Sequence, residues 1–289
     1  MRPFIYAWQE NFLNNGKYEE DRRREFPVQF FVSGGKHKIA GIWSSRVHLF
    51  GVEVPARIFL MGTDQYGRDQ FSRVLHGAQV SFMAGPLAAM LAICIGLAAG
   101  GVAGYFGAWT DELIMAAAEL FLCVPWLYLL IAVRALLPLD LEPRKAFFMT
   151  IGLLGILGWA RPARLVRGVV LSAKEREYVR AARGFGASDF YLLRKHVLPQ
   201  TRSVLLTQAA LLVPSYILAE ITLSFLGLGI NEPEASLGTL LASLQSYHVL
   251  IFSPWMWLPA LALVPAFLNF YFLAHALSDV DGQVHPWAK

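Results

Sequence analysis

Four long segments of the chain contain no Asp, Glu, Lys or Arg. They are residues 74–110, 146–160, 203–219 and 235–278. A helix needs about 20 mostly apolar residues to cross the hydrocarbon core of a bilayer. Buried helices of soluble proteins rarely run uncharged for so long. The pattern therefore predicts an all-α polytopic membrane protein.

Five transmembrane helices follow from this pattern. They are expected at roughly residues 80–106, 113–137, 144–161, 204–229 and 255–277. The third is short, because Lys145 and Arg161 flank it, and snorkelling of these two side chains to the interfaces would let it span. Pro125, Pro214, Pro259 and Pro265 are candidate kinks within or beside the spans.

Basic residues gather in one loop. Residues 161–202 contain ten of the 25 Lys and Arg residues and only three acidic ones, which predicts a cytoplasmic loop. That orientation places the tail, residues 281–289, inside the cell and residues 1–79 and 230–254 outside. A nucleic-acid site is not favoured, because the loop is tethered between two spans and lacks a stacking pattern of aromatic residues.

Residues 1–79 are rich in charge and differ from the transmembrane domain expected over residues 80–280. The strand candidates are residues 26–32, 38–43, 47–54 and 57–60, with a turn at residues 33–35. We expect a small β-rich extracytoplasmic module. No signal peptide precedes it, so a preceding transmembrane helix is expected to be missing from this chain.

A lead-in motif precedes the first span. Its residues are Gly62, Thr63, Asp64, Gly67, Arg68, Asp69, Ser72 and Arg73. Glycines suit tight turns, and the carboxylates and the arginine can form hydrogen bonds within a compact junction. Nothing in the motif indicates a catalytic role.

The basic loop contains a second motif over residues 177–199. Ala181 and Ala182 allow another surface to approach closely, Gly186 can adopt positive φ, and Ser188 or Asp189 can cap a following helix. We expect two short helices joined by a sharp turn, which form a knob for a cytoplasmic partner. The composition also fits a surface loop held to anionic lipid, and the residues alone do not separate the two.

Five motifs in this order resemble the permease subunits of ABC importers for dipeptides, oligopeptides and nickel, specifically the second, C-type permease of each pair. They lie at residues 62–73, 103–111, 159–167, 177–199 and 220–229, within a resemblance that covers residues 62 to about 280. It implies a type I importer permease fold in the bacterial inner membrane. It also implies a second permease, two ATPases and an extracytoplasmic binding protein as partners. ATP and Mg²⁺ would bind the ATPases, so this chain is expected to hold no cofactor and not to be an enzyme.

The resemblance implies a coupling loop that docks into the ATPases. Its residues here are Tyr178, Ala181, Ala182, Gly186, Ala187, Ser188, His196, Leu198 and Pro199. Arg180 stands where the family usually has an acidic residue, and Leu237 stands where a tryptophan is common. The family normally has six spans, so its first helix is the one expected to be absent.

Other classes of function are less well supported. The chain lacks a P-loop, a metal-binding spacing of histidines and a Gly-x-Ser-x-Gly elbow, which argues against an enzyme. A secondary transporter or a membrane scaffold remains the alternative, with Glu119, Glu220 and Ser224 as candidate pathway residues. Packing of Glu220 between helices is the favoured interpretation. Peptides are the first substrate expected, ahead of nickel chelates and glycans.

Overall fold

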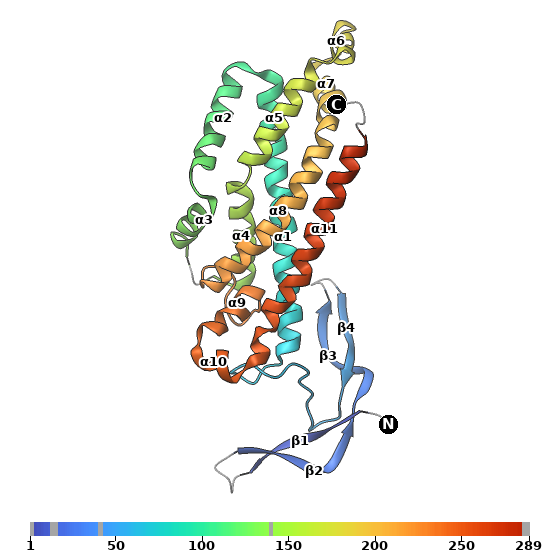
Figure 1. Ribbon diagram of the computed structural model, residues 1–289, viewed down its shortest axis with the longest axis vertical. Coiled ribbons are helices and arrows are strands. Elements are labelled where there is room, and N and C mark those ends of the chain that lie inside the picture. Colours follow the sequence, from blue (N-terminus) through green and yellow to red (C-terminus); the bar gives the residue numbers. More distant parts are fainter. Residues whose placement is uncertain (1–2, 12–16, 40–42, 139–140, 285–289) are drawn as a thin grey trace. The chain divides into compact units, whose positions relative to one another are not determined.

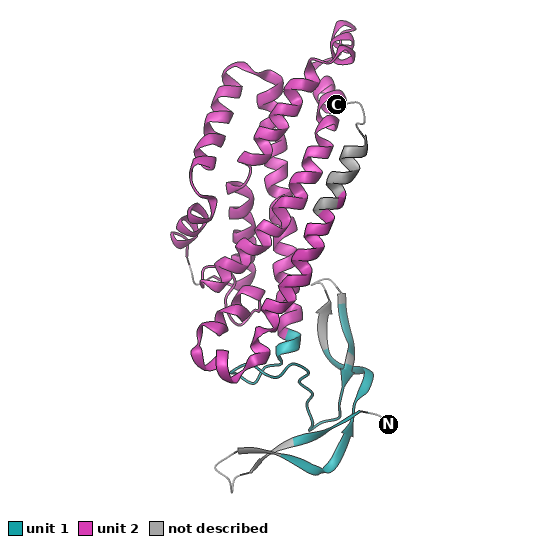
Figure 2. Cartoon of the chain, viewed as in Figure 1, with its two compact units in different colours: residues 1–72 teal, residues 73–289 magenta. Residues whose placement is uncertain are grey.

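The computed structural model describes residues 3–11, 17–39, 43–138 and 141–284 (Figure 1). The chain divides into two compact units, residues 1–72 and 73–289 (Figure 2).

The N-terminal unit contains two antiparallel hairpins. Strands β1 (Phe4–Asn11) and β2 (Lys17–Pro27) form the first, and β3 (Gln29–Ile39) and β4 (Trp43–Gly51) form the second. Ala7, Phe26 and Ala56 are the buried residues of its small apolar cluster.

The predicted turn at residues 33–35 is wrong. These residues lie inside β3, and the pairing with β4 changes register between Ser33 and His37 instead of reversing there. The strand candidate at residues 57–60 is not a strand. The candidate strand 38–43 contains the end of β3 and the first residue of β4, and residues 40–42 between them lie outside the described residues.

The second unit is helical. Its helices are α1 (Gln70–Phe106), α2 (Ala108–Cys123), α3 (Trp126–Ala135), α4 (Pro143–Leu157), α5 (Ala160–Lys174), α6 (Glu177–Gly184), α7 (Asp189–Leu192), α8 (Arg202–Phe225), α9 (Leu237–Ala242), α10 (Tyr247–Phe252) and α11 (Leu258–Val284). Helix α1 begins in the last residues of the first unit. Helices α6 and α7 lie at one end of the bundle, and α9 and α10 lie at the opposite end (Figure 1). Of the expected tail 281–289, residues 285–289 lie outside the described part.

Where five spans are predicted, the described ranges contain three to five apolar stretches, and not all of them are straight. Within the described ranges, three helical stretches are long and apolar enough to cross a membrane, namely Gln70–Phe106, Asp189–Phe225 and Pro254–Leu273. Two bent pairs, α2 with α3 and α4 with α5, bring the total to five if each pair is one span.

The bends correct two predicted spans. Helices α2 and α3 meet at 86°, next to Pro125, so residues 113–137 do not form one straight helix. Helices α4 and α5 meet at 42° around Gly158 and Trp159, without a proline at the break. Residues 161–174, expected to be part of the loop, continue the third span as α5. Pro214 and Pro265 lie inside α8 and α11.

Glycines on α1 let its backbone contact α5 directly. Gly96, Gly100 and Gly104 recur every fourth residue and so share one face of the helix. A Cβ atom at Gly100 would lie 2.3 Å from the carbonyl oxygen of Ala163, and one at Gly104 would lie 2.9 Å from that of Arg167. Small residues at such spacing are a common means of helix association in membranes, where the lipid gives no hydrophobic drive between helices.

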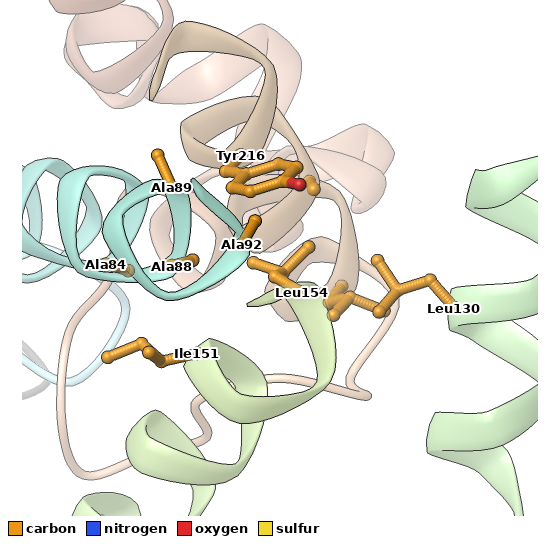
Figure 3. Close-up of a cluster of buried hydrophobic side chains, with 10 residues drawn as sticks. Ala84, Ala88, Ala89, Ala92, Leu130, Ile151, Leu154 and Tyr216 are labelled. Carbon is orange, nitrogen blue, oxygen red and sulfur yellow. The ribbon is translucent and has the colours of Figure 1, made fainter. Parts of the chain in front are cut away.

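Alanines on α1 likewise let α4 and α8 pack closely against this helix. Ala84, Ala88 and Ala92 are fully buried and pack in one cluster with Leu154 of α4 and Tyr216 of α8 (Figure 3). The cluster also holds residues of α3, so it ties the bent pairs to the straight helices α1 and α8.

We predict that Gly100→Ala separates α1 from α5. The added methyl group meets a backbone oxygen that cannot move independently of its helix, and overpacking of this kind costs about 1–3 kcal/mol. The melting temperature of the detergent-purified protein should fall.

Gly168→Ala is the matched control, because a Cβ atom at this α5 position has no neighbour within 4 Å among the described residues. It should leave the melting temperature unchanged or raise it slightly, since alanine favours helix. Equal melting temperatures for the two variants would contradict the proposed packing.

Candidate functional site

Residues 177–199 form the predicted knob. Helix α6 ends at Gly184, and Gly186 adopts φ of 84°. The amide of Gly186 donates to the carbonyl of Arg183 (2.9 Å), and the amide of Ala187 donates to that of Ala182 (3.2 Å). These two bonds define a Schellman motif, which favours glycine at its left-handed position. The sharp turn predicted at Gly186 is confirmed.

The second helix of the knob has its own cap. The hydroxyl of Ser188 accepts a hydrogen bond from the amide of Tyr191 (3.4 Å), so Ser188 rather than Asp189 is the N-cap of α7. The chain then passes through a π-helical turn, Leu193–Val197, and a 3-10 turn, Leu198–Thr201, before α8 begins. Pro199 lies in the second of these turns.

A small core fastens the knob to the bundle. Val179, Leu192 and Val197 are buried against Val166 and Val170 of α5. The predicted coupling residues divide between two faces. Ala182, Ala187 and Leu198 pack against this core, whereas Ala181, Gly186 and Ser188 are exposed.

Polar contacts join the knob to the end of α1. The phenol of Tyr105 donates a 2.6 Å hydrogen bond to Asp189 and accepts a 3.0 Å bond from Arg183. Arg183 also lies 3.2 Å from the Asp189 carboxylate. Lys174, at the end of α5, donates to the carbonyl of Gly104 (2.9 Å). These bonds resist rotation of the knob relative to α1 and α5.

The motif at residues 103–111 lies at the same end of the bundle. Arg167 of α5 makes two 2.5 Å hydrogen bonds to the carboxylate of Asp111 of α2. Such a bidentate pair fixes orientation as well as distance. It connects α2 to α5 near the knob.

Arg180, which departs from the family pattern, forms an ion pair with Glu175. The Arg180 guanidinium lowers the pKa of the Glu175 carboxyl through this hydrogen bond. His196 lies between two tyrosine rings, with ring centroids 6.0 Å from Tyr178 and 5.6 Å from Tyr191. The structure therefore brings Tyr178 and His196 together on one side of the knob.

Two exposed phenylalanines of the knob were not among the predicted site residues. Phe185 is 93% exposed at the turn, and Phe190 is 73% exposed on α7. Tyr178 and Tyr191 are also exposed. The helical period could have identified Phe190, because it lies two positions before the buried Leu192 and so on the opposite face of the helix.

Glu220 lies elsewhere, in the interior of the bundle. It is fully buried on α8, and the hydroxyl of Ser224 donates to its carboxyl group (2.8 Å). Ser81 of α1 and Ser236 also lie close to the carboxyl. The Ser224 hydroxyl in turn accepts from the amide of Ile230 (3.1 Å). These contacts fit a packing role, and a pathway role for Glu220 stays a prediction.

Glu119 lies on another helix and in another environment. It is exposed on α2, and no hydrogen bond or ion pair joins it to the described part of the chain.

The lead-in motif forms a compact loop. The Asp64 carboxylate accepts hydrogen bonds from the amides of Tyr66 and Arg68 (2.9 Å each) and from the Arg68 side chain (2.7 Å). Burial opposes ionisation of Asp64, but these hydrogen bonds outweigh it and lower the pKa. Gly62 and Gly67 adopt positive φ. Thr63 forms a backbone bridge with Asp69.

The end of the motif starts α1. Asp69 accepts a hydrogen bond from the amide of Ser72 (3.0 Å), as an N-cap residue does. In the second unit, Arg73 forms an ion pair with Glu232 (2.6 Å). The motif is structural in all of these contacts.

Residues 92–279 match the family model described as "Binding-protein-dependent transport system inner membrane component". The dipeptide transport system permease protein DppC of Bacillus subtilis is 41% identical over 186 residues, which cover 64% of this chain and 56% of that protein. The oligopeptide transport system permease protein OppC of Mycobacterium tuberculosis is 38% identical over 214 residues, 74% of this chain and 72% of that protein.

Solved structures show the same fold at low sequence identity. A chain from the crystal structure of an amino acid ABC transporter has a TM-score of 0.51 and 18% identity, over 71% of this chain and 92% of that one. A chain of the MetNI methionine ABC transporter has a TM-score of 0.52 and 16% identity, over 72% and 97%.

The family match covers the apolar helices and the knob together. The chain is therefore a multi-pass membrane protein, and it belongs to the family of inner membrane components of binding-protein-dependent transport systems.

Proposed function

We propose that the chain is one of two permease subunits of an ATP-binding-cassette importer and forms half of the pathway for peptides across the inner membrane. The observation that carries this proposal is the knob at residues 177–199. It is preorganised by a Schellman turn, is tipped with exposed aromatic residues and projects from one end of a bundle of apolar helices.

The knob suits transmission of motion from a partner. Two ATPase subunits that close on ATP would hold it in a groove, and the aromatic side chains would supply the contact area. Its buried core on α5 and its hydrogen bonds to α1 would carry that motion into the spans as a rigid body. Alternating access would then move the substrate inward from an external binding protein.

The proposal assigns ATP and Mg²⁺ to the partner subunits. The sequence lacks a P-loop, so this chain would contribute no catalytic group. The knob and the end of α11 would face the cytoplasm, in line with the excess of Lys and Arg in residues 161–202. The N-terminal unit and α9 and α10 would face outward.

The alternative, an ion-coupled secondary transporter, predicts a different energy source. Uptake by the importer should stop when the Walker lysine of the ATPase partners is replaced. It should continue when a protonophore collapses the proton gradient while ATP is maintained. The reverse pair of results would favour the alternative.

Gly186→Val should uncouple ATP hydrolysis from uptake. The position has space for a side chain, but φ of 84° is a strained conformation for a β-branched residue. The substitution should therefore reshape the turn and cost about 1–2 kcal/mol locally. Peptide uptake and ATPase activity are measured together in proteoliposomes.

Gly184→Ala is the control, because this glycine has no neighbour near its Cβ position within the described ranges and has helical geometry. It should transport as the unmodified chain does. Normal uptake by Gly186→Val would contradict a coupling role for the turn.

Phe185→Ala should weaken binding of the ATPase subunits. A side chain 93% exposed contributes little to the fold, whereas loss of an aromatic anchor typically costs more than about 1 kcal/mol of binding, or at least roughly fivefold in Kd. Affinity for the purified ATPase is measured in detergent.

Tyr247→Ala, which removes an exposed aromatic ring from α10 at the opposite end, should bind normally. Equal affinities would count against the knob as the docking site.

The N-terminal unit is proposed to contact the binding protein. Phe30 and Phe31 on β3 are 68% and 72% exposed, and exposed apolar groups of this kind are common at interaction surfaces. Replacing both with serine should lower peptide uptake when the concentration of the binding protein is limiting. The affinity for the ATPase subunits should not change. Unaltered uptake and unaltered complex formation with the binding protein would refute this assignment.

A further inference from the structure

A cavity lies where both bent helix pairs pass α8. Its volume is about 210 Å³, and the residues that matter here are Trp126 of α3, Gly158 at the α4–α5 bend, Arg161 of α5, and Ser215 and Tyr216 of α8. The remaining lining is mostly apolar. The space lies at both bends, because Gly158 lines it and Trp126 directly follows Pro125.

Among the described residues that line this cavity, Arg161 is the only charged one. Its side chain is exposed, and it forms no ion pair or hydrogen bond with any part of the chain that the structure describes. Lys174 lies thirteen positions further along α5, which is about 20 Å of helix. The Arg161 side chain is therefore too short to snorkel to the membrane interface at that end of α5.

Arginines this deep in a span usually face a bundle interior or a water-filled passage. Ser215 lies at a similar depth on α8, thirteen residues after Arg202. The two side chains from different helices therefore line one cavity at one level of the bundle.

Tyr216 supplies a second hydrogen-bond donor. Its side chain is only 4% exposed, and its hydroxyl has no hydrogen-bond partner within the described residues. A Cβ atom at Gly158 would lie 1.7 Å from that hydroxyl oxygen, so the glycine at the bend makes room for it. A buried hydroxyl without a partner is costly and is a natural place for a ligand atom.

One guanidinium and one phenol, surrounded by apolar and aromatic side chains, form a donor set without an acidic residue. Carboxylates accept such bonds, and arginine binds them in a planar, two-pronged geometry. The cavity is smaller than the roughly 300–1,000 Å³ of ordinary ligand pockets, so it fits one end of a peptide rather than a whole one. The C-terminal carboxylate is the end that every unmodified peptide shares.

We propose that this cavity is a carboxylate-binding subsite of the translocation pathway, in which Arg161 and the Tyr216 hydroxyl hold the C-terminal carboxylate of a passing peptide. The inference rests on the proposed function. Because each peptide offers the same group, the contact would orient substrates without selecting among their side chains.

The test uses a reporter thiol inside the cavity. Cys94 and Cys123, both exposed, are first replaced by serine, and Ser215→Cys is introduced into the complete transporter in nanodiscs. The thiol is modified with anionic and cationic methanethiosulfonates of similar size. The anionic reagent should react faster, and Arg161→Gln should lower the anion-to-cation rate ratio about tenfold.

Two control variants separate charge from structure. Arg161→Lys should keep most of the preference for the anionic reagent. Ser246→Cys, near α10 at the opposite end of the bundle, should show a ratio that does not change with Arg161→Gln. The proposal is overturned if Arg161→Gln leaves the anion-to-cation rate ratio at Ser215→Cys unchanged. It is also overturned if neither aqueous reagent reacts with this thiol.

Peptide protection identifies the ligand. Alanyl-alanine should slow modification of the Ser215→Cys thiol, and alanyl-alanine amide should not. Tyr216→Phe should raise the peptide concentration needed for protection about fivefold without lowering the melting temperature. If alanyl-alanine and alanyl-alanine amide protect the thiol equally while peptide uptake is intact, the carboxylate subsite is overturned and the proposed function is not. If the unmodified complex takes up no peptide, the proposed function itself is overturned.

Discussion

The contact between the α1 and α5 backbones is the constraint on which the rest of the helical unit depends. Gly96, Gly100 and Gly104 present no side chain to α5, so the two helices approach to within backbone contact. Lipid offers no hydrophobic drive for this approach, and close packing must provide the attraction instead. With α5 held in this way, its two ends have defined places. One end carries the knob, and the other forms the bend that opens the cavity beside Arg161.

This arrangement joins the two proposed sites by one rigid element. The knob is packed on Val166 and Val170 of α5, and Arg161 lies on the same helix, about 20 Å of helix before Lys174 at its knob end. A displacement of the knob would therefore tilt α5 and change the cavity at its far end. Tyr105 and Asp111 add polar ties from α1 and α2 at the knob end. Arg161 makes no comparable hydrogen bond or ion pair within the described residues, so the end of α5 at the cavity is free to respond to a ligand.

Local chemistry explains which predictions succeeded. The turn at Gly186 and a cap at Ser188 or Asp189 depend on a few neighbouring residues, so the sequence signals predicted both features, and the structure assigns the cap to Ser188. The break at Pro125 follows equally from a local rule. The bend at Gly158 has no such local signal, because no proline lies at the break; the glycine there leaves room for the hydroxyl of Tyr216, a residue distant in the sequence. The turn expected at residues 33–35 failed because pairing with β4 continues through these residues with a shift in register.

Charge-free segments and their lengths were enough to determine that the chain is a polytopic helical protein, because a bilayer demands long apolar helices whatever their packing. The order of the motifs was enough to identify the family. Only the folded bundle decided which side chains meet. It buried Glu220 among serines, exposed Phe185, and moved Arg161 from a predicted loop to a cavity that both bent helix pairs and α8 line. Such contacts join residues far apart in the chain, and their geometry depends on how closely α1 and α5 can approach, which no local pattern specifies.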